Sequence, residues 1–197
     1  LGHRISRRAV RVTGQEVPAI SASDAARPLA FLDVDGVLNH FVSADLAERR
    51  GLRRITVVPQ SLPVEFTVIL DPADRDRVLR LARHFEMAWG TTWEEDAPRL
   101  IAPQLGLPTN WPVAHIDRVD AAKVPGILEV AAGRPFVWLD DDVSPADREH
   151  LTRVPQPHRV IEVPAPWVDH RDPRRVTGLT DELVQEAIDW ARGLSAR

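Results

Sequence analysis

Two pairs of carboxylates stand out in this sequence because each pair follows an apolar run. Asp33 and Asp35 end the run in "PLAFLDVDG", and Asp140 and Asp141 end the run in "PFVWLDDD". Carboxylates that lie close together repel one another and are costly to desolvate, so solvent, a cation or a reaction must offset that cost. A set of carboxylates without a cysteine or histidine cluster favours a hard cation such as Mg²⁺.

Two further residues have side chains suited to an anionic substrate. Lys123 is the only lysine in a chain whose other basic residues are arginines, which indicates a position where a compact ammonium is needed instead of a planar fork. Thr91 follows the short apolar stretch "EMAWG" and offers a hydroxyl. One carboxylate can attack phosphorus and a second can protonate the leaving oxygen. A hydroxyl and an ammonium can hold the phosphoryl oxygens, so these residue types predict phosphoryl transfer.

The elements that must position these residues alternate between strand and helix. Strands are expected at residues 29–34, 86–90, 111–116, 134–142 and 158–163, with a β-hairpin at 52–70. Helices are expected at 71–85, 94–106, 120–133 and 180–194, with Asp71 and Thr180 as N-caps of the first and last. Prolines break the second of these helices, and Pro125 and Gly126 interrupt the third.

This alternation predicts the α/β class, with a three-layer, Rossmann-like, mostly parallel sheet. Residues 28–197 are expected to form a single domain, and residues 1–27 a polar lead-in, poorly ordered or forming a peripheral strand. Ligands bind at the carboxyl ends of strands in such sheets. If the strands are parallel, the acidic pairs, Thr91 and Lys123 meet at one edge of the sheet.

In order along the chain, "FLDVDGVLN", Thr91, Lys123 and "VWLDDD" resemble the four motifs of the haloacid dehalogenase (HAD) superfamily of phosphohydrolases. The resemblance spans residues 29–142. It implies Asp33 as the nucleophile, Asp35 as the general acid and base, and Thr91 and Lys123 as ligands of the phosphoryl group. It also implies a Mg²⁺ site made by Asp33, the Asp35 backbone carbonyl, Asp140 and Asp141.

Several assignments within these motifs stay open. Any of Asp140, Asp141 and Asp142 can be the main metal ligand of the last motif, and strand phase favours Asp140. Thr91 and Thr92 pose a similar choice, in which Thr91 fits the motif position better. The candidate substrate contacts are Thr91, Thr92, Gly36 and Trp93. The other tryptophans are expected to pack in the core, and the histidines show no metal spacing.

The chain offers little room for a large cap domain. The gap at 40–70 holds a hairpin flap, and the gap at 93–122 holds one helix and one strand. A HAD enzyme of the capless type is therefore expected, with a site open to bulky phosphorylated substrates. "WGTTWEEDA" and "HRDPRRVTGLTDELVQEAIDW" are also similar to a HAD branch associated with RNA-repair proteins, although Thr92 replaces a small residue and "RR" is an insertion.

These features predict a phosphomonoester hydrolase, with polynucleotide ends as the leading substrate class. The alternatives are a phosphatase of nucleotides or sugar phosphates, and a HAD-like binding module without turnover. The net charge of -4 argues mildly against nucleic acid, whereas the arginines at 49–54 argue mildly for it. The absence of cysteine fits a reducing cytoplasm, no apolar run approaches the ~18 residues of a membrane span, and no stable protein partner is inferred.

Overall fold

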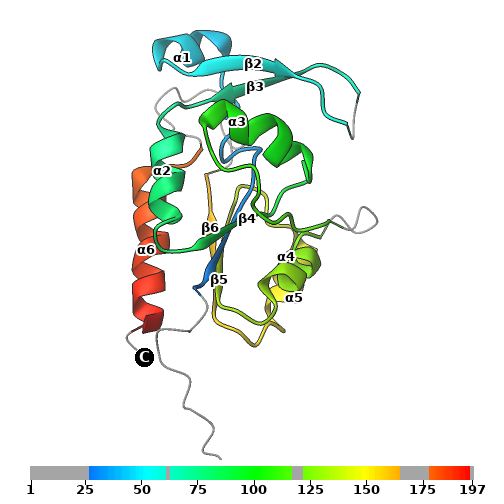
Figure 1. Ribbon diagram of the computed structural model, residues 1–197, viewed down its shortest axis with the longest axis vertical. Coiled ribbons are helices and arrows are strands. Elements are labelled where there is room, and N and C mark those ends of the chain that lie inside the picture. The colour runs from blue at the N-terminus through cyan, green and yellow to red at the C-terminus, as the bar shows by residue number, and fades with distance from the viewer. Residues whose placement is uncertain (1–26, 61–62, 117–121, 165–177, 196–197) are drawn as a thin grey trace, which may run out of the picture.

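The computed structural model describes residues 27–60, 63–116, 122–164 and 178–195, and these form three layers (Figure 1). The middle layer is a four-stranded sheet in the order β4-β1-β5-β6. Its strands are β1 (Leu29–Leu32), β4 (Glu86–Trp89), β5 (Phe136–Asp140) and β6 (His158–Glu162). All neighbouring pairs are parallel, so the four carboxyl ends point the same way.

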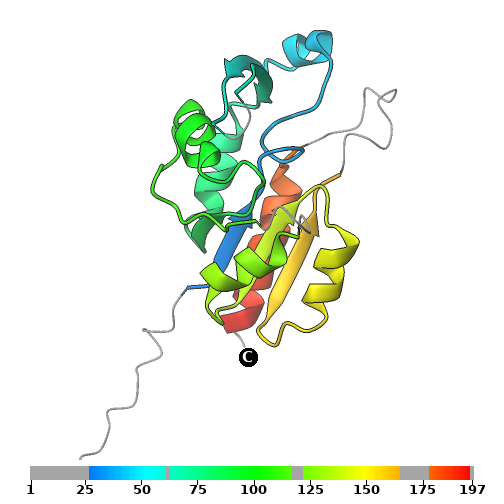
Figure 2. The ribbon, with the colours of Figure 1, turned by 90° about the vertical axis from the view of Figure 1, so that its right-hand side faces the viewer.

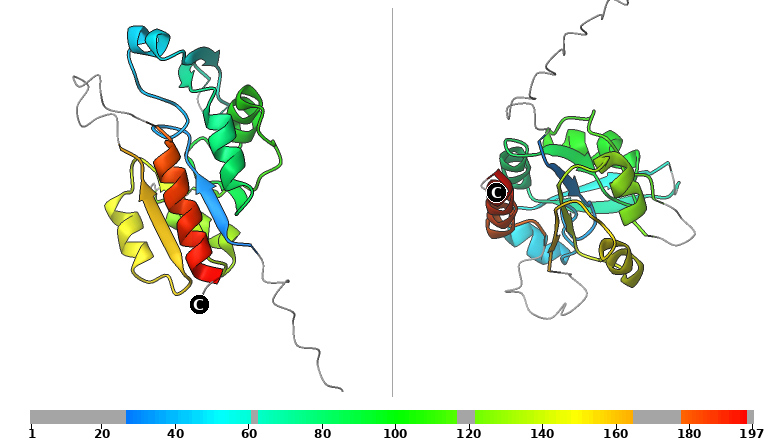
Figure 3. Two further views of the ribbon diagram at one scale, coloured as in Figure 1. Left: turned by 90° about the vertical axis from the view of Figure 1, so that its left-hand side faces the viewer. Right: turned by 90° about the horizontal axis from the view of Figure 1, so that it is seen from below.

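Helices cover both faces of this sheet. On one face lie α2 (Asp74–Leu81) and α6 (Asp181–Ser195), which run side by side (Figure 3). On the other face lie α4 (Val124–Ala131) and α5 (Pro145–Leu151) (Figure 2). The three-layer, mostly parallel α/β fold predicted from the sequence is therefore confirmed. No helix among the described residues is long and apolar enough to cross a membrane.

The central strands are buried on both faces because their side chains alternate between two hydrophobic clusters. Ala30 and Leu32 of β1 pack in the cluster under α2 and α6, whereas Leu29 and Phe31 pack in the cluster under α4. Strands of a parallel sheet covered on both sides read as continuous apolar runs for this reason. The same alternation decides on which side of the sheet the residues after each strand lie.

A second, two-stranded antiparallel sheet lies beyond the carboxyl ends of the main sheet (Figure 1). It is the expected hairpin, formed by β2 (Arg53–Val57) and β3 (Phe66–Leu70). Near it lie the short α1 (Ala44–Arg49), a π-helical turn at Ala97–Ile101 and α3 (Ala102–Leu105). The last two are the expected proline-broken helix, with Pro98 and Pro103 in their first turns.

One predicted strand is wrong. Residues 111–116 form no strand and contribute only an isolated bridge between Val113 and Trp89 of β4. Pro112 has no N–H, and its carbonyl accepts the N–H of Trp89. The N–H of Ile116 is taken by the side chain of Glu94 instead of a strand partner, so the segment leaves the sheet edge after one bridge.

The helix ends also differ from the prediction in places. Asp71 does not cap α2, which begins at Asp74; the Asp71 side chain accepts the N–H of Ala73 in the preceding turn. Pro125 does not interrupt α4, because it lies in the first turn, where its missing N–H has no helical partner to lose. Thr180 does accept the N–H of Leu183 at the start of α6. Helices α1 and α5 were not predicted.

Candidate active site

Strand register brings Asp33 and Asp140 together. Leu32 of β1 is opposite Leu139 of β5, and the N–H of Asp33 donates to the Leu139 carbonyl. By the alternation of the two strands, both aspartates fall on the side of the sheet covered by α4. Like charges on neighbouring strands are destabilising unless a cation lies between them. The amino-terminal end of α4 supplies that cation.

Lys123 lies at the N-cap position of α4 and bridges the two carboxylates. Its Nζ donates to Asp33 Oδ2 and to Asp140 Oδ2, both at 2.6 Å. The three side chains are almost fully buried. Burial acts to lower the pKa of Lys123, but the charges of Asp33 and Asp140 outweigh it and raise that pKa, so the ammonium stays charged. Buried ion pairs offset the cost of desolvation only when the charged atoms are this close together.

Asp147, which lies outside the four motifs, fixes the backbone of Lys123. Asp147 on α5 accepts the N–H of Lys123 at 2.7 Å and that of Val124 at 2.9 Å, both with Oδ1. Its Oδ2 accepts the hydroxyl of Ser144 at 2.7 Å, and the side chain is buried. Asp147 thus caps α4 from a neighbouring helix, since Lys123 itself offers no capping side chain.

Asp141 completes a group of three carboxylates. Asp33, Asp140 and Asp141 each offer one oxygen, and these oxygens lie within 4.8 Å of one another. Asp141 approaches the loop after β1 so closely that a Cβ on Gly36 would lie 2.1 Å from its Cγ. Gly36 also has a positive φ of 69°, which a side chain disfavours. Glycine is therefore required at position 36 for two separate reasons, and the exposed Asp142 is not in the group.

The carboxylate group carries more negative charge than Lys123 balances. Burial and the charge of Asp33 raise the pKa of Asp140 to about 8, and the same two causes raise that of Asp141 to about 6. A divalent cation would relieve this repulsion, and three carboxylate oxygens are the donors that Mg²⁺ takes. The residues present therefore fit such an ion, with Asp33, Asp140 and Asp141 as the candidate side-chain ligands.

The Asp35 side chain belongs to a different set of contacts. Its Oδ1 accepts a hydrogen bond from Asn39 Nδ2 at 2.8 Å, and its Oδ2 accepts one from Trp93 Nε1 at 2.9 Å. Burial raises the pKa of Asp35, and these two hydrogen bonds oppose that shift. A raised pKa suits a carboxyl that must hold a proton before delivering it.

The remaining predicted site residues follow β4. Thr91 is fully buried, and its hydroxyl accepts the N–H of Trp93 at 3.3 Å, whereas Thr92 is exposed. Trp93 is 7% exposed, so most of its ring is covered by protein. The structure thus gives Trp93 a defined partner, Asp35, in addition to the predicted role as a substrate contact.

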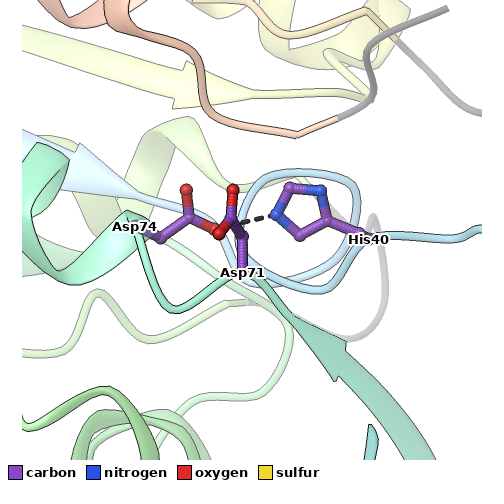
Figure 4. A group of neighbouring side chains, drawn as sticks. All are labelled: His40, Asp71 and Asp74. Atoms are coloured by element: carbon purple, nitrogen blue, oxygen red, sulfur yellow. Dashed lines mark hydrogen bonds and ion pairs between the residues drawn. The ribbon is translucent and has the colours of Figure 1, made fainter. Parts of the chain in front are cut away.

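A second acidic cluster, formed by His40, Asp71 and Asp74, lies beside the loop that follows β1 (Figure 4). His40 Nε2 and Asp74 Oδ2 are 2.8 Å apart, and Arg77 donates to Asp74 Oδ1 and to Asp71 Oδ2, both at 2.8 Å. Burial raises the pKa of Asp74. Burial also acts to raise the pKa of Asp71, but hydrogen bonds from Arg77 and the Ala73 backbone outweigh it and lower that pKa.

The arrangement agrees with the motif order noted in the sequence, because the motifs at Asp33, Thr91 and Asp140 lie at or just after the ends of parallel strands and Lys123 lies at the N-cap of α4. No protein-family model and no curated protein matches the sequence. Part of the narrower resemblance to RNA-repair proteins, at 170–177, lies outside the described residues.

Two solved structures are similar to this chain. One is a variant of the fission yeast RNA polymerase II CTD phosphatase Fcp1 bound to beryllium fluoride, with a TM-score of 0.47 and 12% identity over 88% of this chain and 52% of that one. The other, also of Fcp1, has a TM-score of 0.46 and 14% identity over 88% of this chain and 50% of that one. The chain spans about half the length of these structures, and a likeness this distant carries no inference about activity.

Proposed function

We propose that this protein is a Mg²⁺-dependent phosphomonoester hydrolase that works through an aspartyl-phosphate. The observation that carries the proposal is the buried Asp33–Lys123–Asp140 bridge at the carboxyl ends of parallel strands. It holds one carboxylate oxygen of Asp33 beside a fixed cation, where an anionic substrate would be attracted. A binding module without turnover would not require this costly group of buried charges.

In the proposed first step, a carboxylate oxygen of Asp33 attacks phosphorus, and the bond between phosphorus and the ester oxygen breaks. Asp35 gives its proton to the departing oxygen, so the alcohol leaves neutral. In the second step Asp35, now a carboxylate, takes a proton from water as that water attacks phosphorus. The bond between phosphorus and Asp33 breaks, inorganic phosphate leaves, and Asp35 is protonated again.

The other residues hold charge in place during these steps. Lys123 keeps Asp33 oriented and offers its ammonium to the phosphoryl oxygens, while the Thr91 hydroxyl is proposed to bind the same oxygens. Asp33, Asp140 and Asp141, with the Asp35 backbone carbonyl, would hold Mg²⁺. When bound, that ion supplies positive charge that lowers the repulsion between the substrate and the carboxylates.

We propose phosphorylated polynucleotide ends as the leading substrate class. What supports this is position: α1 and the hairpin lie beyond the carboxyl ends of the sheet, and they carry four arginines (Figure 1). These are Arg49, Arg50, Arg53 and Arg54. Arginines near such a site suit contacts with successive phosphates. Small phosphate esters are the alternative, and a site without a cap domain would admit both.

The test is phosphate release from a panel, with and without Mg²⁺. The panel holds an aryl phosphate, mononucleotides, sugar phosphates, and oligonucleotides phosphorylated at the 3′ or the 5′ end. We expect Mg²⁺-dependent release that falls about 10³-fold or more in Asp33→Asn. Preference for oligonucleotides would support the polynucleotide class, and preference for small esters would support the alternative. No release from any substrate by folded protein would contradict the hydrolase proposal and favour a binding module.

A further inference from the structure

Both oxygens of the Asp35 carboxylate are held by donors that come from outside its own residue. Asn39 Nδ2 donates to Oδ1 at 2.8 Å, and Trp93 Nε1 donates to Oδ2 at 2.9 Å. We propose that Asn39 and Trp93 are positioning residues for the general acid, and that the β2–β3 hairpin holds both of them. This inference rests on the proposed function, because it takes Asp35 as the proton donor.

Asn39 is fixed through its side-chain amide and through its backbone. Its Oδ1 accepts the backbone N–H of Ile69 on β3 at 2.9 Å, and its own backbone N–H donates to the Val34 carbonyl at 2.7 Å. The residue is 2% exposed, so water does not compete for these bonds. The Ile69 bond also determines which end of the amide faces Asp35, since an N–H can pair only with the amide oxygen.

Trp93 is fixed through its ring and its backbone. The ring meets Phe66 of β3 edge to face, with 6.2 Å between ring centroids. The backbone N–H donates to the hydroxyl of Thr91 at 3.3 Å. The indole N–H can only donate, so it pairs with a carboxylate oxygen and never competes with Asp35 for a proton. Both groups that hold Asp35 therefore make a second contact with the same strand, β3.

This arrangement restricts the direction of Asp35 without blocking its chemistry. Each carboxylate oxygen has about two lone-pair sites, and Asn39 and Trp93 use one on each oxygen. A lone pair therefore remains to carry the proton while both hydrogen bonds persist. Proton transfer needs heavy atoms within roughly 2.6–3.2 Å, so a carboxyl free to rotate would spend less time at the leaving oxygen.

The test uses leaving groups that differ in their need for a proton. An alkyl phosphate leaves as a strongly basic alkoxide unless it is protonated, whereas a nitrophenyl phosphate leaves as a weakly basic phenolate. We expect Asn39→Ala and Trp93→Phe to lower kcat/KM for the alkyl ester by roughly 10-fold or more, and for the nitrophenyl ester by less than about 3-fold. The ratio kcat/KM is used because it reports the step in which the ester bond breaks.

Asp35→Asn provides the reference, with the same selectivity and a larger loss of about 10²-fold or more on the alkyl ester. Phe66→Ala tests the hairpin, and we expect a smaller shift in the same direction. Its matched control is Val64→Ala, another exposed apolar side chain of the hairpin region, which should leave the ratio of the two substrates unchanged. Trp93→Phe keeps most of the ring volume, so it carries the test if Asn39→Ala fails to fold.

Equal losses on both esters in Trp93→Phe, or a faster reaction with the alkyl ester, would overturn the inference. The first would show a general structural role, and the second would show that the contacts hold Asp35 away from its substrate. Neither outcome affects the proposed function, which fails only if the unaltered protein releases no phosphate. An active protein whose selectivity ignores Asn39 and Trp93 would therefore reject the positioning role alone.

Discussion

Two acidic clusters include residues of the segment that follows β1, Asp33 in one and His40 in the other, and their negative charge is balanced differently. Asp71 and Asp74 share Arg77, and Asp74 also contacts His40 (Figure 4). We call this the His40 cluster. Three carboxylates of the other cluster, Asp33, Asp140 and Asp141, have the single ammonium of Lys123 between two of them. We call this the Lys123 cluster.

The difference lies in the balance of charge. Both clusters have three oxygen or nitrogen atoms close enough together to hold a metal ion. In the His40 cluster, Arg77 already occupies the position of a cation between the two carboxylates. In the Lys123 cluster the pKa of Asp140 is raised to about 8, chiefly by burial and then by the charge of Asp33, because the one cation does not offset the negative charge. Proximity of acidic groups therefore does not by itself identify a metal site, and the weaker balance of charge makes the Lys123 cluster the better candidate.

Removing the cation from each cluster should have the largest effect. We expect Lys123→Met to lower the free energy of unfolding by roughly 3–5 kcal/mol, because it removes the cation that contacts the buried carboxyl groups of Asp33 and Asp140. Arg77→Met should cost less, about 1–3 kcal/mol, since the Arg77 side chain is 19% exposed and water can replace it in part. Urea unfolding without metal measures both. Equal losses would contradict the view that the Lys123 cluster carries the greater uncompensated charge.

Metal addition should separate the clusters next. We expect Mg²⁺ at about 100 times its Kd to add roughly 2.7 kcal/mol of stability, which raises Tm by about 5–10 °C for a chain of this size. Asp140→Asn and Asp141→Asn should lose most of that increase. Asp71→Asn, the matched change in the His40 cluster, should keep it. A Tm increase that survives in Asp140→Asn but disappears in Asp71→Asn would place the ion in the His40 cluster and contradict this prediction.

Asp140 of the Lys123 cluster and Asp71 of the His40 cluster should also affect stability in opposite directions as pH changes. The pKa of Asp140 is raised from 3.8 to about 8 in the folded chain, so between pH 4 and 8 the folded state holds a proton that the unfolded state has lost. Without metal, this contribution to stability is lost as pH rises, by at most about 1.4 kcal/mol per pH unit. The pKa of Asp71 is lowered, so its contribution is lost as pH falls below 3.8.

Unfolding curves across pH, compared between the unaltered protein and Asp140→Asn or Asp71→Asn, isolate these two contributions. We expect the difference for Asp140→Asn to change mainly between pH 4 and 8, and that for Asp71→Asn only below pH 4. With Mg²⁺ present the first trend should reverse, because the ion binds the carboxylate and not the acid. An unchanged trend with Mg²⁺ would argue against Asp140 as a ligand.

The smallest effect is expected at Asp142. Its side chain is exposed, and its backbone N–H, which a substitution retains, donates to Asp140 Oδ1 at 2.9 Å. We expect Asp142→Asn to change the free energy of unfolding by less than about 0.5 kcal/mol and to leave the Mg²⁺ response intact. Thermal unfolding with and without Mg²⁺ measures this, and a lost response would move the candidate ligand from Asp140 to Asp142.

Much of this fold could be predicted from the sequence, because buried parallel strands read as apolar runs. The strand predicted at 111–116 failed because the decisive contact is distant: the Glu94 side chain takes the N–H of Ile116. The two missed helices are short, and each follows a serine at its N-cap position. Ser144 and Asp147 form a reciprocal cap at the start of α5, and Ser43 caps α1, so capping signals were the available clue.

The candidate site likewise contains residues that could be predicted from the sequence and residues that could not. Asp33 and Asp140 could be predicted to meet, since both lie at the ends of parallel strands, which finish at one edge of the sheet. Lys123 reaches them from the N-cap of α4, although the strand predicted before it does not form. Asp147 and Asn39 could not be found this way. They act on backbone groups of Lys123 and Ile69, which lie 24 and 30 positions away in the chain, and no spacing rule connects them.

The strand order has a consequence for how the chain folds. The first strand, β1, lies in the interior of the sheet, and Leu29 is opposite Glu86 on one side and Phe136 on the other. Neither neighbour exists until much later in synthesis, so β1 cannot be paired on both sides until residue 140 has emerged. Long-range parallel pairing of this kind makes folding slow. The carboxylates of β1 and β5 therefore cannot meet before β5 has been synthesised, so their negative charge is concentrated only after most of the chain has emerged.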